Sequence, residues 1–238
     1  MKYPHIIGLT GPAGSGKDTI ADLLVVHAGF TKMAFADALR AEIVQAFSID
    51  PSFLTERETK ETPLRCLALD RCLDDGFVVR MLIAYTVKGE LLKGERLSLE
   101  APRSPRQIMQ WWGTEYRRHQ SNYYWVNTLL KRAHYLLSQR LASRIVVTDC
   151  RFADEVDAVR ISLHGQLWQV CRDDIGVAPG AHVSEVTGAE FRPDVVINNS
   201  HSVRHLQERV LEAYQASRTG RTGLVPRQQL GKIAGQAA

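Results

Sequence analysis

The stretch GPAGSGKDTIADLL, from Gly11 to Leu24, contains the glycines and the lysine of a phosphate-binding loop, G-x-x-x-x-G-K. It follows a short apolar run, HIIGLT, that suits a buried parallel strand, and it leads into apolar residues at helical spacing that end near Gly29. Glycine lets such a loop curl tightly and turn its backbone N–H groups toward a phosphate, while the following helix adds the positive end of its dipole. This context disfavours the alternative, a tight turn that binds nothing.

The loop departs from the usual pattern at one position. Asp18 stands where Ser or Thr normally follows the lysine, and the hydroxyl comes one residue later, at Thr19. Thr19 is still on the first turn of the helix, where its hydroxyl can hold magnesium or a phosphate oxygen, and an acid such as Asp18 suits the helix dipole. Lys17 supplies a mobile cation for the β- and γ-phosphates. The form G-S-G-K-x-T is similar to the loop of adenylate-kinase-like nucleoside monophosphate kinases, which favours a small-molecule kinase.

Four more short apolar segments predict strands, at residues 32–35, 145–148, 167–172 and 194–200. Helical patterns separate them, and we expect helices at about residues 37–47, 104–116, 122–139, 153–165 and from Ser202 onward. Alternating strands and helices predict an α/β protein, a three-layer α/β/α fold with a five-stranded parallel sheet. Ligands of such sheets bind at the carboxyl ends of the strands, so the residues that follow each strand are the candidates for chemistry.

Asp149 follows the predicted strand RIVVT, as a Walker-B-type acid does, where it would bind magnesium through water or orient the attacking group. The alternative is an N-cap for the helix that begins near FADE. Arg151 lies at the same strand end, and its guanidinium could bridge phosphates in the transition state; the alternative is an ion pair with Asp154 or Glu155. Lys17, Asp149 and Arg151 are the candidate catalytic residues.

The sequence SPRQ at residues 104–107 is a capping box, with proline at the first helical position. Arg106 therefore places a bidentate cation beside the free N–H groups of a helix start, which predicts a seat for a monophosphate dianion. Trp111 and Trp112 could stack on a nucleobase, but tryptophan at helical spacing more often belongs to a core, and we expect core positions for both.

The domain organisation that we predict is one kinase domain over residues 1–216, with an insertion at about 48–102 and a helical acceptor-binding region at about 103–140. In the insertion, residues 64–71 have helical spacing and residues 87–100 suggest a hairpin. The tail at 217–238 is rich in Gly, Gln, Thr and Ala, and we expect it to be disordered.

Composition argues against several classes of protein. Of the 30 basic side chains, four lie after Ser217, where there is no acid, so the remaining basic residues balance the 26 acidic ones. A neutral folded part disfavours a nucleic-acid partner, and no apolar run approaches the roughly 20 residues that would span a membrane. The cysteines form no C-x-x-C pair, which predicts free thiols and no structural zinc; they are Cys66, Cys72, Cys150 and Cys171. The N-terminal residues show no charged-then-apolar signal sequence, so we expect a cytoplasmic location.

The chain resembles the phage-type deoxynucleoside monophosphate kinase family in a series of motifs that covers most of positions 5 to 215. These are GPAGSGKDTIADLL, FADALR, SPRQIMQWWGTEYRR, Trp125, VVTDCRFADEVDAVR, HVSE and DVVINNSHSVRHL. The first motif and VVTDCRF are shared with other kinases of the superfamily, whereas the SPRQ…GTEYR block next to Trp125 is more discriminating.

The resemblance implies a P-loop kinase fold and ATP-dependent transfer of a phosphoryl group to a deoxynucleoside 5′-monophosphate, with magnesium as cofactor. It implies an ATP site at Gly14, Ser15, Gly16, Lys17, Asp18 and Thr19, with Arg172 reaching in from a lid. It implies an acceptor site at Asp37, Arg106, Gly113, Thr114 and Trp125, and magnesium at Thr19 and Asp149. The location would be the host cytoplasm for a phage-encoded protein, and a homodimer is left open.

Two features depart from the family pattern. The 48–102 insertion matches nothing in it, and residues 173–182 contain no arginine, so closure over ATP would rest on Arg172. Dephospho-coenzyme A kinase, or another small-molecule P-loop kinase, is the nearest alternative, and the SPRQ…GTEYR block argues against dephospho-coenzyme A kinase. A regulatory or nucleic-acid-associated P-loop NTPase is an alternative from another class, which the balanced charge of the folded part disfavours.

Overall fold

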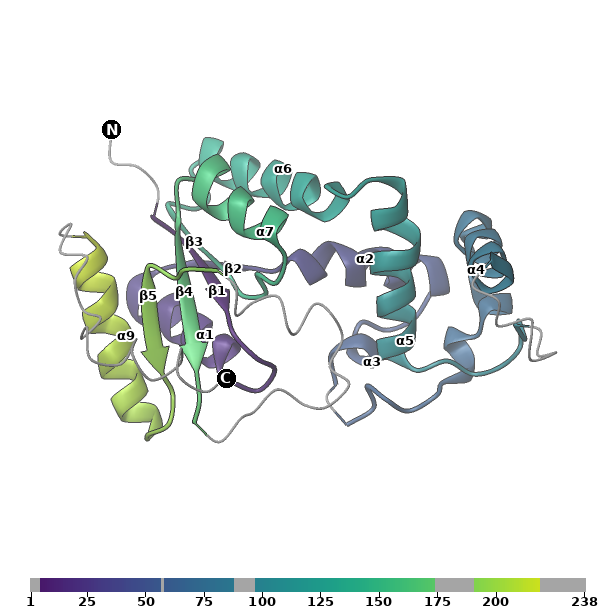
Figure 1. Ribbon diagram of the computed structural model, residues 1–238, viewed down its shortest axis with the longest axis horizontal. Coiled ribbons are helices and arrows are strands. Elements are labelled where there is room, and N and C mark those ends of the chain that lie inside the picture. The colour runs from purple at the N-terminus through teal and green to yellow at the C-terminus, as the bar shows by residue number, and fades with distance from the viewer. Residues whose placement is uncertain (1–4, 57, 88–96, 174–190, 219–238) are drawn as a thin grey trace, which may run out of the picture. The chain divides into compact units, whose positions relative to one another are not determined.

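The computed structural model describes residues 5–56, 58–87, 97–173 and 191–218 (Figure 1). The chain divides into a sheet unit, made of Met1–Ala34 and Leu130–Ala238, and a helical unit, Phe35–Leu129. The division falls within helix α6, Tyr124–Ser138. In the part of the chain that is described, no helix combines the length and the apolar composition needed to cross a bilayer.

The sheet unit contains one sheet in which every pair of neighbouring strands is parallel. The strand order is β2-β3-β1-β4-β5, so the first strand of the chain lies at the centre. This confirms the predicted five-stranded parallel sheet. The strands are β1 His5–Thr10, β2 Thr31–Met33, β3 Arg144–Val147, β4 Gln166–Cys171 and β5 Val195–Asn198.

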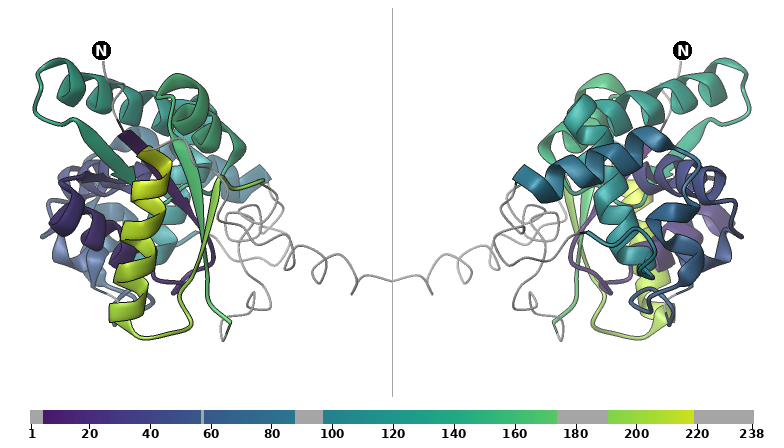
Figure 2. Two further views of the ribbon diagram at one scale, coloured as in Figure 1. Left: turned by 90° about the vertical axis from the view of Figure 1, so that its left-hand side faces the viewer. Right: turned by 90° about the vertical axis from the view of Figure 1, so that its right-hand side faces the viewer.

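Helices cover both faces of this sheet. On one face, Ile7 and Leu9 of β1 pack in a buried cluster with residues of α1 (Lys17–Ala28) and α9 (Val203–Arg218); the left view of Figure 2 shows α9 in front of the strands. On the other face, Gly8 adjoins Cys150 and the π-helical turn η5 (Ala158–Ser162), which continues α7 (Ala153–Asp157). The two-sided burial explains the nearly continuous apolar strands and confirms the three-layer α/β/α architecture.

The helical unit packs around aromatic side chains. Phe77 of α4 (Asp75–Val87) lies 4.6 Å from Trp112 and 5.5 Å from Tyr116, centroid to centroid, and both partners belong to the π-helix η4 (Trp111–Arg118). The predicted capping box at the start of α5 (Pro105–Gln110) is confirmed in part, because the Gln107 N–H donates to Ser104 Oγ at 3.2 Å. The other elements are α2 Phe35–Phe47, α3 Ser52–Thr55 and the 3-10 turns η1 Arg65–Leu67 and η2 Leu69–Arg71.

One local prediction was wrong, and the boundary of another is shifted by two residues. Residues 64–71 form no continuous helix, because Ala68 is extended (φ −68°, ψ 147°) and separates two 3-10 turns. Leu64 instead forms an antiparallel bridge with Arg103: the Leu64 N–H donates to the Arg103 carbonyl at 2.9 Å, and the Arg103 N–H donates to the Leu64 carbonyl at 3.3 Å. Helix α2 begins at Phe35 rather than Asp37, so the strand before it ends at Met33; Asp37 lies in the first helical turn, as expected.

Three other expectations fall partly or wholly outside the described residues. These are the hairpin at 87–100, the HVSE motif at 182–185 and the tail at 217–238.

Candidate functional site

The phosphate-binding loop joins β1 to α1 through glycines in the left-handed region of φ. Gly11, Gly14 and Gly16 have φ values of 140°, 78° and 99°, and Gly16 caps α1. At Gly11 the need for glycine is also steric, because an added Cβ would lie 2.3 Å from the carbonyl oxygen of Val170. The loop therefore passes directly against the carboxyl-terminal part of β4.

Lys17 turns its ammonium group back onto the loop. Its Nζ donates to the carbonyl oxygens of Gly11 at 2.8 Å and Pro12 at 2.7 Å. The Ser15 N–H also donates to Pro12, at 3.2 Å. Ser15 is fully buried, and its hydroxyl has no hydrogen-bond partner within the described part of the chain.

Asp18 and Thr19 have exposed side chains at the start of α1. Asp18 pairs with Lys32 at 3.1 Å, and Asp22 pairs with the same ammonium at 2.9 Å. Burial lowers the pKa of Lys32, but the hydrogen bonds to the two aspartates outweigh it and raise that pKa overall. The Asp18 side chain thus lies against Lys32, whereas Thr19 keeps its hydroxyl at an exposed position.

Asp149 and Arg151 follow β3, which is hydrogen-bonded to β1. Val147 is aligned with Gly8, and three residues further on the Cys150 N–H donates to the Leu9 carbonyl at 3.1 Å. The pairing therefore carries Asp149 alongside the end of β1, where the phosphate-binding loop begins. Burial raises the pKa of the intervening Cys150 thiol well above its usual value, which keeps that group neutral.

The helix after β3 is capped by other residues than the sequence suggested. Phe152 is the N-cap of α7, so the alternative of Asp149 as the N-cap was wrong. Glu155 accepts hydrogen bonds from the backbone N–H groups of Arg151 at 2.8 Å and Phe152 at 3.1 Å. The Arg151 side chain is exposed at this strand end.

Arg172 directly follows β4 and is exposed. The residue after β5 lies close to the end of β4, since the Asn199 N–H donates to the Cys171 carbonyl at 2.8 Å. Asn199 also reaches the loop itself, with its side-chain Nδ2 donating to the Ser15 carbonyl at 2.9 Å. Sequence reasoning marked the end of this strand as a place to examine but assigned Asn199 no role.

The oxygen atoms at this edge of the sheet suit magnesium. Thr19 offers an exposed hydroxyl and Asp149 a carboxylate, and Mg²⁺ in phosphoryl-transfer sites takes few protein ligands, nearly all of them oxygen. Among the described residues no three His, Cys, Asp or Glu side chains gather into a metal cluster.

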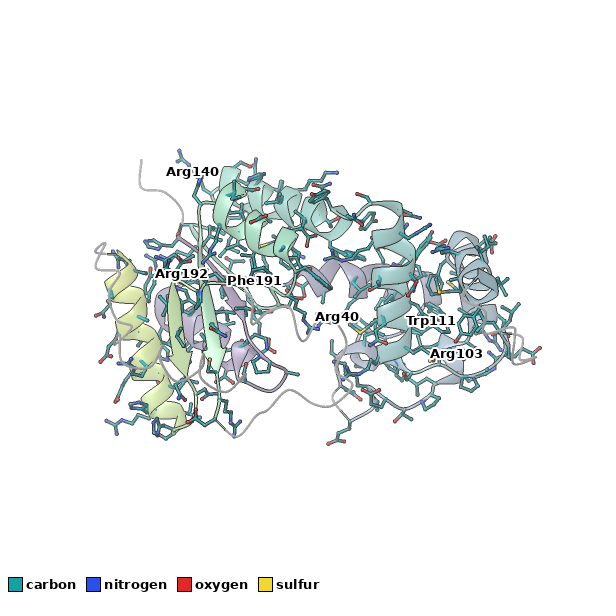
Figure 3. All side chains as sticks on the ribbon, in the orientation of Figure 1. Arg40, Arg103, Trp111, Arg140, Phe191 and Arg192 are labelled. Atoms are coloured by element: carbon teal, nitrogen blue, oxygen red, sulfur yellow. The ribbon has the colours of Figure 1, made fainter. Side chains whose placement is uncertain are left out.

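Of the candidate acceptor residues, all within the helical unit, Asp37 and Arg106 each pair with a nearby residue. Asp37 bonds Arg40 at 3.3 Å, and Arg40 is labelled in Figure 3. The Arg106 guanidinium bonds the Glu61 carboxylate through Nε.

The prediction of free N–H groups at the start of α5 was wrong. The Arg106 N–H donates to the Lys60 carbonyl at 3.0 Å, and Ser104 satisfies the N–H groups of Gln107 and Ile108. Only the guanidinium of Arg106 therefore remains a candidate phosphate ligand at this helix start.

Gly113 and Thr114 belong to the π-helix η4, and Trp125 contacts Gly113. The Trp125 indole N–H donates to the Gly113 carbonyl at 3.1 Å, and the Trp125 side chain is buried. Thr114, the next residue of η4, is exposed. The wider turns of π-helices occur frequently at functional sites.

Trp112 is buried, as expected, but Trp111 is half-exposed. The Trp111 ring centroid lies 5.3 Å from the guanidinium of Arg103, and both residues are labelled in Figure 3. The Trp111 ring also meets the Tyr85 ring edge-on, with 5.7 Å between centroids. The prediction of a core position is therefore confirmed for Trp112 only.

A polar network that sequence reasoning missed lies behind this π-helix. Glu42 of α2 accepts hydrogen bonds from Trp112 Nε1 at 2.8 Å, Arg117 Nε at 2.7 Å and the Tyr124 hydroxyl at 2.6 Å. Burial and the hydrogen bond to Glu42 raise the pKa of Tyr124 to about 12, so its hydroxyl stays a donor at neutral pH. The partners of Glu42 are 70 to 82 residues away along the chain, which hides the network from local patterns.

Comparison with known proteins gives one family. The family described as "Deoxynucleotide monophosphate kinase" matches residues 80–210, a stretch that contains Arg106, Asp149 and Asn199. A protein of Acanthamoeba polyphaga mimivirus named "Putative deoxynucleotide monophosphate kinase" is 26% identical over 211 residues, which cover 87% of this chain and 94% of that protein.

Similar solved structures include the protein TT1252 of Thermus thermophilus, with 20% identity, a TM-score of 0.44 and coverage of 91% of this chain and 98% of that one. A dephospho-CoA kinase of Campylobacter jejuni has 12% identity, a TM-score of 0.41 and coverage of 89% and 96%. At these TM-scores the fold assignment rests on the strand order and the loop geometry alone.

Proposed function

The chain belongs to the deoxynucleotide monophosphate kinase family, and from this premise we propose that it transfers the γ-phosphoryl group of ATP to a deoxynucleoside 5′-monophosphate, giving the diphosphate and ADP. The observation that supports ATP as the phosphoryl donor is the glycine loop, with Lys17 folded over its carbonyl oxygens. The family match supports a deoxynucleoside monophosphate as the acceptor.

On the donor side, residues 14–19 hold the ATP phosphates. Backbone N–H groups of the loop bind phosphate oxygens, and the Lys17 ammonium moves from the carbonyls of Gly11 and Pro12 to the β- and γ-phosphates. That exchange is favourable because a phosphate dianion is a stronger acceptor for the ammonium than a neutral carbonyl is. Arg172 adds a cation from the end of β4.

At the transfer centre, Arg151 neutralises charge that develops on the transferred group, and Asp149 orients the attacking phosphate oxygen. Thr19 and Asp149 would hold magnesium, directly or through water. Magnesium, when bound, supplies the charge neutralisation that brings two phosphate groups together. Most of the rate comes from positioning and electrostatics, since phosphoryl transfer asks for little covalent chemistry from the protein.

On the acceptor side, the Arg106 guanidinium binds the monophosphate, displacing Glu61, and Asp37 and Thr114 offer polar contacts to the nucleoside. The indole of Trp125 is buried and bonds Gly113, so in this proposal it holds the π-helix in place.

The direct test is ADP release from ATP and magnesium against a panel of ribo- and deoxyribonucleoside monophosphates, with dephospho-coenzyme A included. We expect turnover only with one or more deoxynucleotides, which would also identify the base. Turnover with dephospho-coenzyme A alone would overturn the acceptor assignment. ATP hydrolysis indifferent to every acceptor, together with salt-sensitive retention on DNA, would favour the nucleic-acid-associated NTPase instead.

Replacing Arg106 by alanine should raise the KM of the acceptor at least about tenfold and leave the KM of ATP within about twofold, because a charge-assisted bond to phosphate contributes roughly 1.5–3 kcal/mol. Glu61→Gln is the matched variant: it removes the carboxylate that competes for Arg106 and should lower the acceptor KM. Steady-state kinetics with each substrate varied in turn would measure both effects. A larger change for ATP than for the acceptor in Arg106→Ala would contradict the assignment.

A further inference from the structure

One contact joins the phosphate-binding loop to a distant part of the chain. Asn199 Nδ2 donates to the Ser15 carbonyl at 2.9 Å across 184 residues, and Asn199 is half-buried there. The carbonyls of Gly11, Pro12 and Gly16 accept hydrogen bonds from within the loop or from the first turn of α1.

The segment that carries Asn199 is itself held firmly. Its own N–H bonds the Cys171 carbonyl at 2.8 Å, and the Ser200 N–H folds back onto Asn198 Oδ1 at 2.8 Å. Ser200 Oγ in turn accepts from the Asp173 N–H at 2.9 Å, which ties the ends of β4 and β5 together. The Asn199 amide is therefore presented to the loop from a hydrogen-bonded turn.

The contact sets the direction of one peptide group in the loop. In a trans peptide the carbonyl and the N–H of the same unit point in opposite directions, so fixing the Ser15 carbonyl also fixes the Gly16 N–H. The Asn199 amide also lies directly against Gly16, because a Cβ added to Gly16 would be 2.2 Å from Asn199 Nδ2. Since Gly16 has a φ of 99°, this peptide has the conformational freedom to turn if nothing holds it.

We propose that Asn199 is a positioning residue for the phosphate-binding loop: its amide holds the Ser15 carbonyl outward and keeps the Gly16 N–H directed at the nucleotide phosphates. This inference rests on the proposed function, because it assumes that the loop binds ATP. Asn199 acts through the loop and touches neither the base nor the sugar.

The test measures binding of Mg-ATP and of inorganic tripolyphosphate by isothermal titration calorimetry, for the wild type, Asn199→Ala and Asn199→Asp. We expect Asn199→Ala to weaken both ligands by the same factor, about tenfold, since one hydrogen bond is lost and the peptide is released. Asn199→Asp keeps the size but cannot donate, and it should lose at least as much. Val203→Ala, at an exposed position at the start of α9, is the control and should bind both ligands within about twofold of the wild type.

The outcomes separate this inference from the proposed function. A wild type that binds neither ligand would overturn both. A wild type that binds, with both Asn199 variants equally tight, would overturn this inference alone, as would a loss for ATP without a loss for tripolyphosphate, which would assign Asn199 to the base or sugar. Thermal melting without ligand shows whether each variant is folded. If Asn199→Ala does not fold, the binding of Asn199→Asp compared with that of the wild type tests the inference.

Discussion

Replacing Lys17 by alanine is expected to lower kcat/KM for phosphoryl transfer by at least about a thousandfold, or roughly 4 kcal/mol, while the protein stays folded. The ammonium is the one cation that the loop carries on its own sequence between Gly11 and Thr19. Without it, the negative charge on the β- and γ-phosphates in the transition state loses its nearest compensation.

The substitution also removes two bonds to loop carbonyls, at Gly11 and Pro12, so a structural effect has to be separated from a catalytic one. Lys17→Met keeps most of the side-chain volume and should be as inactive as Lys17→Ala. Lys131→Ala, an exposed lysine on α6, is the control and should retain full turnover. The measurement is steady-state ADP release together with the thermal unfolding midpoint of each variant.

A Lys17→Ala variant that keeps full turnover would contradict the phosphate-binding assignment. If Lys17→Ala loses turnover but also melts far below the wild type, the turnover of Lys17→Met tests the assignment instead, because the methionine side chain still fills the loop.

The sheet unit was largely predictable because its signals are local. Strand β1, the glycine loop and α1 follow one another within 24 residues, and Gly29 ends α1 as expected, with its N–H bonded to the carbonyls of Leu24 and Val25. The final helix likewise begins after Ser202, whose Oγ accepts from the His205 N–H. In each case the residues that determine the structure are neighbours in sequence.

Helix α4 shows why the insertion could not be predicted. Phe77, Met81 and Ala84 are buried at helical spacing, but Val79 and Ile83, about half-exposed, are apolar as well. A helix that is apolar on nearly all sides has no 3.6-residue contrast for a pattern to detect. The three-dimensional packing decides which of these residues are buried.

The candidate site residues divide in the same way. Lys17 and Asp149 could be proposed from the sequence because each directly follows a predicted strand or belongs to a motif. No local pattern could assign Asn199 a role, because its partner, Ser15, is 184 residues away. The prediction of free N–H groups at the start of α5 failed at Arg106 for a related reason, since the acceptor of its N–H, the Lys60 carbonyl, lies in the poorly predicted insertion.

Glu42 provides the second large expected effect, this time on stability. Its carboxylate joins α2 to η4 and α6 through three donors, and the side chains of Glu42 and Arg117 are only 23% and 18% exposed. The Arg117 guanidinium also lies over the ring of Tyr116 at 4.4 Å and bridges to Asp74 at 3.7 Å. The network is thus both charged and largely shielded from water.

Glu42→Ala should lower the free energy of unfolding by roughly 2–4 kcal/mol, because it leaves a cation and two neutral donors without their acceptor. For a chain of this length that corresponds to a fall in Tm of roughly 5–15 °C. Glu42→Gln, which keeps one acceptor oxygen and the side-chain volume, should lose less. Thermal and urea unfolding of the full chain would measure the difference.

Asp70→Ala is the matched control, because Arg65 and Asp70 form a bidentate pair with two bonds of 2.6 Å in which the arginine side chain is 46% exposed, against 18% for Arg117. Its bonds are at least as short as those of Glu42, yet water can replace each of them, so we expect no measurable change in Tm. Equal effects of Glu42→Ala and Asp70→Ala would mean that bond geometry, and not shielding from water, determines the contribution of these pairs. A Tm unchanged in Glu42→Ala would contradict the view that this carboxylate holds the π-helix in place.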